Sequence, residues 1–288
     1  MRAGGVPRHD HDMREDRYAA AMLEHYDRGE EADRLVTSSA GQLEFERTQE
    51  IVLRRLPPPP ATIADIGGGP GRYALWLAGL GYRVVHRDVV PMHVEQLLAA
   101  ASAKPEAGSA VESAVGDARS LDLADASVDA VLLLGPLYHL TRRADRVQAL
   151  REACRVVRPG GPVFAAAISR WAVRYDGVLR LRLYEQFPAV LEEIGPLERT
   201  GVFPPLWPGS FTAYTHRPGQ LRSEFGLGGL VDTDVVSVEC GAFMLPDLKE
   251  RMADPVARQV IMETARALER VPELMGLGSH LLATGQRP

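Results

Sequence analysis

The stretch Ala64-Asp65-Ile66-Gly67-Gly68-Gly69-Pro70-Gly71-Arg72-Tyr73 decides the fold. It combines a short apolar strand that ends in an acid, a run of glycines, and the first residues of a helix. Glycines permit positive φ and let a ligand approach bare backbone N–H groups at a helix start. The stretch therefore predicts a small-molecule site at the end of the first strand of an α/β domain.

Outward from this stretch, apolar β-type runs alternate with helical patterns. The predicted elements are strands at 61–66, 82–88, 111–116, 128–134, 163–169, 235–243 and 280–285, and helices at 72–80, 92–103, 143–157, 218–225 and 247–268. Strands that are apolar on both faces and separated by helices are typical of a parallel sheet covered on two sides. We predict a doubly wound, Rossmann-like α/β fold with a mostly parallel, seven-stranded sheet.

The segments around this core suggest a division into five parts. We expect a disordered tail at 1–13, an N-terminal helical cover with a proline linker at 14–60, a cofactor-binding core at 61–169, a lid or substrate insertion at 170–216, and completion of the core at 217–288. The four consecutive prolines at 57–60 cannot continue a helix and so mark the boundary of the cover.

The predicted lid is rich in aromatic and arginine side chains. Its eight aromatic residues are Trp171, Tyr175, Tyr184, Phe187, Phe203, Trp207, Phe211 and Tyr214. They favour a hydrophobic or aromatic ligand, or form the core of a subdomain. Arg170, Arg174, Arg180 and Arg182 either clamp an acidic ligand or lie on a solvated helix face.

Three carboxylates indicate which ligand the glycine loop holds. Gly69, Gly71 and Ala74 fit a loose dinucleotide fingerprint, but Asp65 before the loop would repel a pyrophosphate and attract an ammonium group. Asp88 ends the second strand, where a carboxylate can accept both ribose hydroxyls. Asp117 follows the third strand, where an adenine edge would lie. Together they predict an adenosine that carries an amino acid.

At this point the sequence resembles class I S-adenosylmethionine-dependent methyltransferases, and within them a bacterial small-molecule subgroup. The resemblance is carried by the motifs at 65–71, Asp88, 116–118, 134–140 and 158–161. It implies S-adenosyl-L-methionine as cofactor and S-adenosyl-L-homocysteine as product. The implied cofactor-binding residues are Asp65, Gly67, Gly69, Gly71, Asp88, Val89, Asp117, Ala118, Gly135 and Tyr26. His86 and Arg87 depart from the usual small or apolar residues before the acid.

Three residues are candidates for the chemistry of methyl transfer. Positioning supplies much of the rate, and a base is useful where the acceptor must lose a proton. His139 is either that base or a shaping residue beneath the cofactor, and Tyr138 either contacts the sulfonium or packs in the core. His216, which ends the insertion, is a second possible base or a capping residue.

Composition limits the partners and the location. A net charge of −5 disfavours nucleic-acid and membrane binding, and two cysteines favour a reducing, cytoplasmic setting. The run His9-Asp10-His11-Asp12 has no fixed surroundings for a metal, so we expect no metal site. We expect a small-molecule methyl acceptor as partner and a monomer or homodimer.

The leading hypothesis is methyl transfer to an O, N or C atom of a small, hydrophobic or aromatic metabolite. One alternative uses the same cofactor in an intramolecular displacement that releases methylthioadenosine. Another is a non-catalytic module that binds the cofactor. Nucleic-acid methylation is a weaker hypothesis, because no lysine-rich stripe accompanies the motifs.

Overall fold

The computed structural model describes residues 26, 34–104, 108–206 and 210–288. The predicted tail at 1–13, the His9–Asp12 run and Trp207 lie outside the described residues. The predicted N-terminal helical pattern is present as α2 (Arg34–Thr37) and α3 (Ser39–Leu53). Helix α3 begins where the Ser38 hydroxyl accepts the Gly41 N–H, and it ends before the prolines, as predicted.

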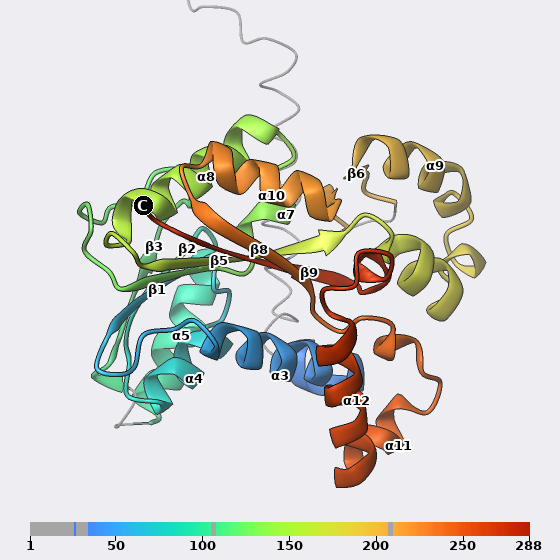
Figure 1. The fold of residues 1–288 in the computed structure, drawn as a ribbon, viewed down its shortest axis with the longest axis horizontal. Coiled ribbons are helices and arrows are strands. Elements are labelled where there is room, and N and C mark those ends of the chain that lie inside the picture. The colour runs from blue at the N-terminus through green and yellow to red at the C-terminus, as the bar shows by residue number, and fades with distance from the viewer. Residues whose placement is uncertain (1–25, 27–33, 105–107, 207–209) are drawn as a thin grey trace, which may run out of the picture.

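A mixed sheet forms the centre of the molecule (Figure 1). Five parallel strands lie in the order β3-β2-β1-β4-β5, and β9 and then β8 complete the sheet next to β5. These strands are β1 (Thr62–Ile66), β2 (Arg83–Asp88), β3 (Val111–Val115), β4 (Ala130–Leu133), β5 (Pro162–Ser169), β8 (Val231–Ser237) and β9 (His280–Gln286). The predicted α/β fold with its seven core strands is confirmed.

Two further strands bring the described sheet to nine. They are β6 (Val202–Phe203) and β7 (Ala213–His216), and both come from the insertion. Strand β7 pairs in parallel with the last two residues of β5, which extends past the end of β4. The insertion is therefore joined to the core by strand pairing at the edge where the site lies.

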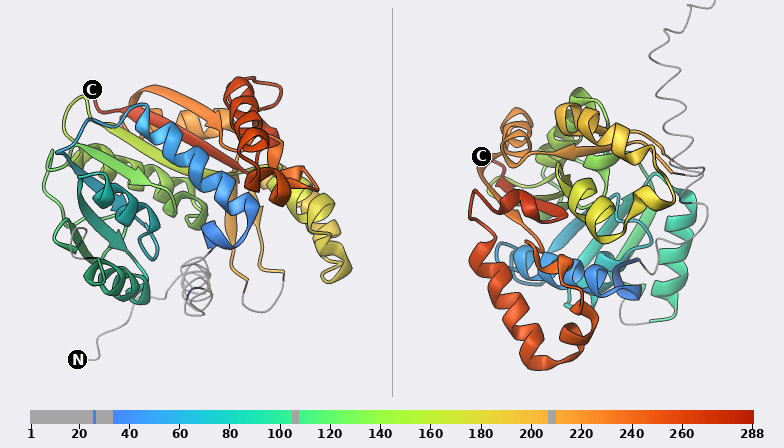
Figure 2. Two further views of the ribbon diagram at one scale, coloured as in Figure 1. Left: turned by 90° about the horizontal axis from the view of Figure 1, so that it is seen from below. Right: turned by 90° about the vertical axis from the view of Figure 1, so that its right-hand side faces the viewer.

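Helices cover both faces of the sheet because successive strand residues point to opposite sides (Figures 1 and 2). Ala64 and Val131 pack in a core with α8 and α10, whereas Ile63 and Leu132 pack in a second core with α3, α4 and α5. The helices are α4 (Arg72–Gly79), α5 (Pro91–Ser102), α8 (Arg143–Val156) and α10 (Pro218–Leu227). This layering leaves the carboxyl ends of the parallel strands at one edge of the sheet.

The insertion extends to one side of the sheet (Figure 1). It contains a π-helix η2 (Val173–Arg180), a 3-10 turn η3 (Leu183–Glu185) and α9 (Val190–Thr200) before β6 and β7. Its arginines are engaged within the chain: Arg170 donates to the carbonyl oxygens of Thr215 and Glu198, and the other three pair with carboxylates. These contacts support a structural role for the arginines rather than an acidic-ligand clamp.

The C-terminal part differs from the prediction in two places. Strand β8 spans 231–237 rather than 235–243, and the chain then forms a short turn, η4 (Ala242–Met244). The helix predicted over 247–268 is two helices, α11 (Leu248–Ala253) and α12 (Pro255–Leu268). Pro255 has no N–H to continue α11, and the Asp254 side chain caps α12 by accepting the Ala257 N–H.

A last turn, η5 (Met275–Leu277), precedes β9. Both cysteines are free thiols; Cys240 is buried and Cys154 is half-buried. Within the described parts of the chain, no helix is long and apolar enough to cross a bilayer.

Candidate active site

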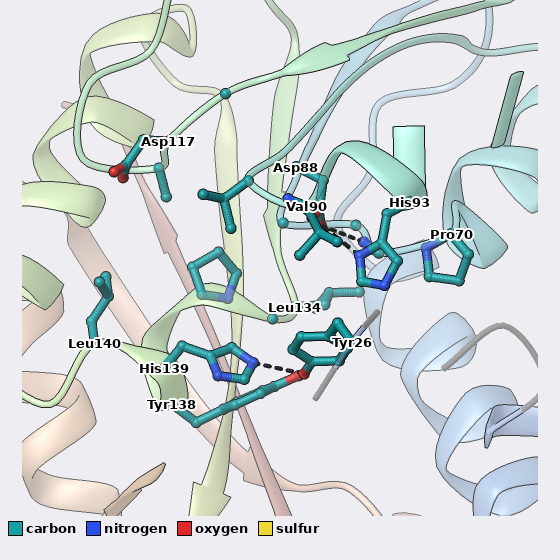
Figure 3. A pocket seen from close by; sticks show the side chains of 18 of the residues that line it. Tyr26, Pro70, Asp88, Val90, His93, Asp117, Leu134, Tyr138, His139 and Leu140 are labelled. Atoms are coloured by element: carbon teal, nitrogen blue, oxygen red, sulfur yellow. Dashed lines mark hydrogen bonds and ion pairs between the residues drawn. The ribbon is translucent and has the colours of Figure 1, made fainter. Parts of the chain in front are cut away.

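A cavity of about 230 Å³ lies at the carboxyl ends of β1, β2 and β4, and we call it the first cavity. Its walls come from the loops after these strands, from the short helix α7 (Pro136–His139), and from Tyr26, Leu35 and Thr212. Figure 3 shows Asp88 and His93 on one side and Tyr138 and His139 on another, with Tyr26 between them. The site predicted at the end of the first strand is therefore a real concavity.

The glycine loop forms the floor of the first cavity. Gly67 has φ +64°, and a Cβ there would lie 2.5 Å from the Pro136 ring, so only glycine fits this turn. Gly67, Gly68 and Gly69 line the cavity. Gly71 instead packs against Leu97 where α4 begins, outside the lining, so its contribution is to the turn into the helix.

Asp65 lies directly beneath this loop. Its side chain is fully buried, and a Cβ at Gly68 would lie 2.4 Å from its Oδ2. Burial, and then the negative charge of Asp88, raise the pKa of Asp65 to about 7. The backbone N–H of Ala74 opposes this rise, but neither carboxyl oxygen is held by a hydrogen bond of normal geometry. Asp65 therefore stands behind the cavity wall, where it can act on a cationic ligand only through the loop.

Asp88 is held rigidly at the cavity by the protein itself. Its Oδ2 accepts the Gly69 N–H at 2.8 Å, and its Oδ1 accepts the Val90 N–H at 2.9 Å and lies 3.1 Å from Nδ1 of His93. Burial opposes ionisation, but His93 and the backbone donors keep the pKa of Asp88 below its usual value. A carboxylate offers about four acceptor positions, so capacity remains for a ligand hydroxyl.

The unusual residues before Asp88 support the loop. Nε2 of His86 lies 3.0 Å from the Gly69 carbonyl oxygen, and its Nδ1 lies 2.8 Å from the Ser113 hydroxyl. Burial lowers the pKa of His86 to about 4, so the neutral ring donates to Gly69 and accepts from Ser113. Arg87 points away and pairs with Asp122 and Glu112.

The loops after β2 and β3 form another wall. Val89, Asp117 and Ala118 all line the cavity. Asp117 is half-exposed and pairs with Arg119, whose backbone N–H it also accepts. The half-exposed Val89 presents an apolar side chain to the cavity, as a planar ring requires. The predicted base-binding residues thus share one wall.

Aromatic side chains from distant segments meet at the α7 end of the cavity. The Tyr26 hydroxyl lies 2.8 Å from Nε2 of His139, and the Tyr26 ring contacts the ring of His93 edge-on and that of Phe211 in a stack. Gly135 and Tyr138 also line this end. The structure therefore brings together Tyr26, Tyr138 and His139 as predicted. It also brings in Phe211, one of the lid aromatics, and His93, which the sequence did not indicate.

His216 is placed elsewhere, and its position does not support the predicted catalytic base. Its side chain is 0% exposed, and its Nε2 lies 3.1 Å from a carboxylate oxygen of Glu224. Glu224 also pairs with the buried Arg146 at 2.7 Å, and burial lowers the pKa of His216. Strand β7 turns this side chain under α10 and away from the first cavity.

The residues present fit S-adenosylmethionine. The glycine floor forms one part of the first cavity, the fixed carboxylates of Asp88 and Asp117 form another, and aromatic rings close the third. The buried carboxyl of Asp65, whose pKa is about 7, would ionise beside a ligand that bears ammonium and sulfonium charge, and its negative charge would then favour that ligand. A pyrophosphate would meet repulsion at the same place.

The comparisons with known proteins agree with this assignment. Residues 64–165 match the model of a methyltransferase domain. The chain is 35% identical over 129 residues to a ubiquinone/menaquinone biosynthesis C-methyltransferase from Acidiphilium cryptum, covering 43% of this chain and 49% of the relative. It is 38% identical over 109 residues to a ubiquinone biosynthesis O-methyltransferase from Methylobacterium, covering 38% and 41%. The chain thus spans about half the length of these relatives, or less.

Solved structures show the same fold. A S-adenosylmethionine-dependent methyltransferase from Methanosarcina mazei superposes with a TM-score of 0.55 at 20% identity, covering 82% of this chain and 96% of that one. A possible histamine N-methyltransferase from Thermotoga maritima superposes with a TM-score of 0.54 at 16% identity, covering 93% and 99%. The ordered motifs, the sheet and the matched domain agree: residues 64–165 are similar to a methyltransferase domain, and the fold is that of solved S-adenosylmethionine-dependent methyltransferases.

Proposed function

We propose that this protein transfers the methyl group of S-adenosylmethionine to an O, N or C atom of a small, hydrophobic or aromatic metabolite. One observation carries the proposal: a single cavity holds the fixed carboxylate of Asp88 at one side and the hydrogen-bonded pair Tyr26 and His139 at another. The Asp88 carboxylate suits a nucleoside ribose, and the pair of Tyr26 and His139 suits a reacting acceptor.

The cofactor contacts follow from the walls of the first cavity. Asp88 would accept the ribose hydroxyls, and Asp117 with the Ala118 N–H would meet the adenine edge beside Val89. Gly67 and Gly69 would face the methionyl part, and the Gly135 carbonyl oxygen would accept its ammonium group. Asp65 would stabilise the same cationic part through the loop.

In the proposed reaction, the bond between sulfur and the methyl carbon breaks as the bond between the acceptor and that carbon forms. S-adenosylmethionine supplies the methyl group when bound, and the bonding electron pair stays on sulfur. His139 takes the proton from an O–H or N–H acceptor, and Tyr26 fixes the imidazole for this step. Tyr138, on the same short helix, lines the wall with its ring.

The proposal covers oxygen, nitrogen and carbon acceptors. The names of the two curated relatives describe a C-methyltransferase and an O-methyltransferase, so similar domains serve both chemistries. A carbon acceptor leaves a proton to be removed after transfer, and an oxygen acceptor must lose its proton as it attacks. His139 can serve either case.

The part of the chain around the cavity supports the functional division predicted from the sequence. We propose that residues 14–60 cover the cofactor, 61–169 bind it, 170–216 contribute to the acceptor site and 217–288 complete the core. Tyr26 and Leu35 from the first segment line the cavity, and so does Thr212 from the insertion.

The test is a product analysis. The full chain is incubated with methyl-labelled S-adenosylmethionine and a mixture of small phenols, quinols and amines, and the products are separated by chromatography. The proposal predicts label in an acceptor and an equal amount of S-adenosylhomocysteine. Methylthioadenosine instead would indicate the intramolecular displacement, and cofactor that binds without being consumed would indicate a non-catalytic module.

A further inference from the structure

A second cavity, of about 290 Å³, lies between the insertion and the adjoining ends of β5 and β9. Its walls are mostly apolar side chains from η2, from the segment around η3, and from strands β5, β6 and β7. They include Ile168, Ala172, Val173, Leu181, Leu183, Phe203, Phe211 and Ala213. Ligand sites in proteins are mostly apolar concavities with a few polar groups, so an apolar space of this size has room for a small ligand.

The second cavity adjoins the first. The segment at 210–213, which we call the partition, contributes to both: Ser210, Phe211 and Ala213 line the second cavity, and Thr212 lines the first. The centroid of the Phe211 ring lies 4.8 Å from that of His139 and 6.0 Å from that of Tyr26. Among the described residues, the partition therefore lies between a molecule in the second cavity and the proposed methyl-transfer site.

Polar groups occur in the wall contributed by the start of β9. Ser279 is only 8% exposed, lines the second cavity, and its hydroxyl oxygen has no hydrogen-bond partner. Leaving a buried hydroxyl unsatisfied costs stability, and such groups in folded proteins ordinarily have partners. This hydroxyl therefore points to a ligand group that completes it.

The neighbouring His280 is positioned by a buried carboxylate. Nδ1 of His280 lies 2.5 Å from Oε1 of Glu239, and Oε2 of the same carboxylate accepts the His280 backbone N–H at 3.0 Å. Glu239 is 2% exposed, and Glu44 lies 3.8 Å from the same ring nitrogen. The nitrogen and oxygen atoms with which these three residues could bind a metal ion lie within 4.8 Å of one another. The contacts of Glu239 with His280, however, are those of a hydrogen-bonded pair that orients the imidazole ring.

We propose that the second cavity is the binding site for the methyl acceptor, an apolar, ring-containing molecule with a hydroxyl or carbonyl group that hydrogen-bonds to Ser279 and His280. This inference rests on the proposed function and deepens it. The acceptor reaches past Phe211 into the first cavity, where His139 lies. Phe211 is then a specificity-determining residue, and Ser279 and His280 are recognition residues.

The experiment uses two probes of matched shape, 2-naphthol and 2-methylnaphthalene, titrated into the full chain and followed by probe fluorescence. The hydroxyl of the first is replaced by a methyl group in the second. The wild type is expected to bind 2-naphthol about fivefold more tightly, since one hydrogen bond contributes on the order of 1 kcal/mol. Ser279→Ala should reduce this preference and leave the binding of 2-methylnaphthalene unchanged.

A substitution that fills the second cavity tests whether the probes bind there. Val173→Trp places an indole in the second cavity and should weaken both probes by about tenfold or more. Leu179→Trp, on the same helix at a side chain that is 60% exposed, is the matched control and should leave both unchanged. Binding of S-adenosylhomocysteine, measured by calorimetry on each variant, should be unaltered and shows that the variants are folded.

Failure of this inference is distinguishable from failure of the proposed function. If S-adenosylhomocysteine binds but 2-naphthol does not, or if 2-naphthol binds equally to the wild type and Val173→Trp, the second cavity is not the acceptor site. If 2-naphthol binds as expected and S-adenosylhomocysteine does not, the proposed function fails at the first cavity instead.

Discussion

The hydroxyl of Tyr26 lies 2.8 Å from Nε2 of His139, although 113 residues separate them in the sequence. Tyr26 belongs to the N-terminal segment, and His139 ends the short helix after β4. The contact makes the N-terminal segment part of the cavity wall. It also fixes the imidazole, because a hydrogen bond at one ring nitrogen sets the tautomer and orientation of the ring.

Replacing Tyr26 with Phe should lower turnover while leaving cofactor binding nearly intact. The substitution removes only the hydroxyl that holds His139, and general-base catalysis contributes roughly 10²- to 10⁴-fold. We expect kcat to fall by about tenfold or more, with a change in the S-adenosylhomocysteine Kd of less than about threefold. Initial rates of labelled methyl transfer and calorimetry measure the two quantities.

Tyr82→Phe is the matched control for this change. The Tyr82 hydroxyl donates to the Pro57 carbonyl oxygen, outside the first cavity, so turnover should stay at the wild-type level. Equal rates of methyl transfer by Tyr26→Phe and the wild type would contradict the proposal that Tyr26 positions His139.

Replacing Asp88 with Asn should weaken cofactor binding. An amide has one acceptor oxygen in place of two, so it cannot accept the Gly69 and Val90 N–H groups on separate oxygens and also bind a ribose hydroxyl. Hydrogen bonds to a charged group contribute about 1.5–3 kcal/mol, so the Kd for S-adenosylhomocysteine should rise at least about tenfold. Asp122→Asn, at an exposed acid paired with Arg87, should leave the Kd unchanged.

Asp65 should make the protein less stable as the pH rises from about 4 to about 7. The pKa of Asp65 is raised from 3.8 to about 7 in the folded protein, so over this interval the folded chain keeps a proton that the unfolded chain releases. The slope of the unfolding free energy with pH is then negative. Asp65→Asn cannot ionise, so its stability relative to the wild type should increase across the interval, by roughly 1–3 kcal/mol.

Urea unfolding of both proteins at several pH values tests this sign. Asp122→Asn is a control in which the pKa shift has the opposite sign, because hydrogen bonding to Arg87 lowers the pKa of Asp122. Its difference from the wild type should therefore stay nearly constant between about pH 5 and 7 and shrink below the unfolded pKa. A difference for Asp65→Asn that shrinks with rising pH would contradict the assigned environment.

The Glu224 cluster should matter for stability rather than for chemistry. Glu224→Ala leaves the buried Arg146 and His216 without their common carboxylate, and breaking a buried ion pair costs about 3–5 kcal/mol. His216→Gln, whose amide can still donate to Glu224, should keep turnover within about twofold of the wild type under folded conditions. A loss of turnover of about a hundredfold in a folded His216→Gln variant would contradict this structural role and would support His216 as a catalytic base.

The sequence predicts the fold and one side of the site well because their signals are local. The glycine run after β1, the acid at the end of β2 and the acid after β3 each lie within a few residues of a strand end. In a parallel sheet, those strand ends meet at one edge. Asp88, Asp117, Gly67 and Gly135 therefore line one cavity as predicted.

The remaining features depend on tertiary packing that no local pattern encodes. His93 follows Asp88 by five residues, and in the sequence it looks like any other position of a helix. Only in the folded chain does α5 bring its ring to the Asp88 carboxylate. Phe211 and Thr212 reach the site because β7 pairs with the end of β5, and the same pairing turns His216 into the core. The break at Pro255 was visible in the sequence, as an Asp-Pro step at a helix start.

The most direct test of the cofactor assignment is a calorimetric titration of the full chain with S-adenosylhomocysteine and, separately, with NAD. The glycine floor, the fixed Asp88 and the buried Asp65 predict one S-adenosylhomocysteine bound per chain and no heat from NAD, because its pyrophosphate would be repelled by the Asp88 carboxylate and would gain nothing from Asp65 beneath the loop. No binding of S-adenosylhomocysteine, or its displacement by NAD, would contradict the account.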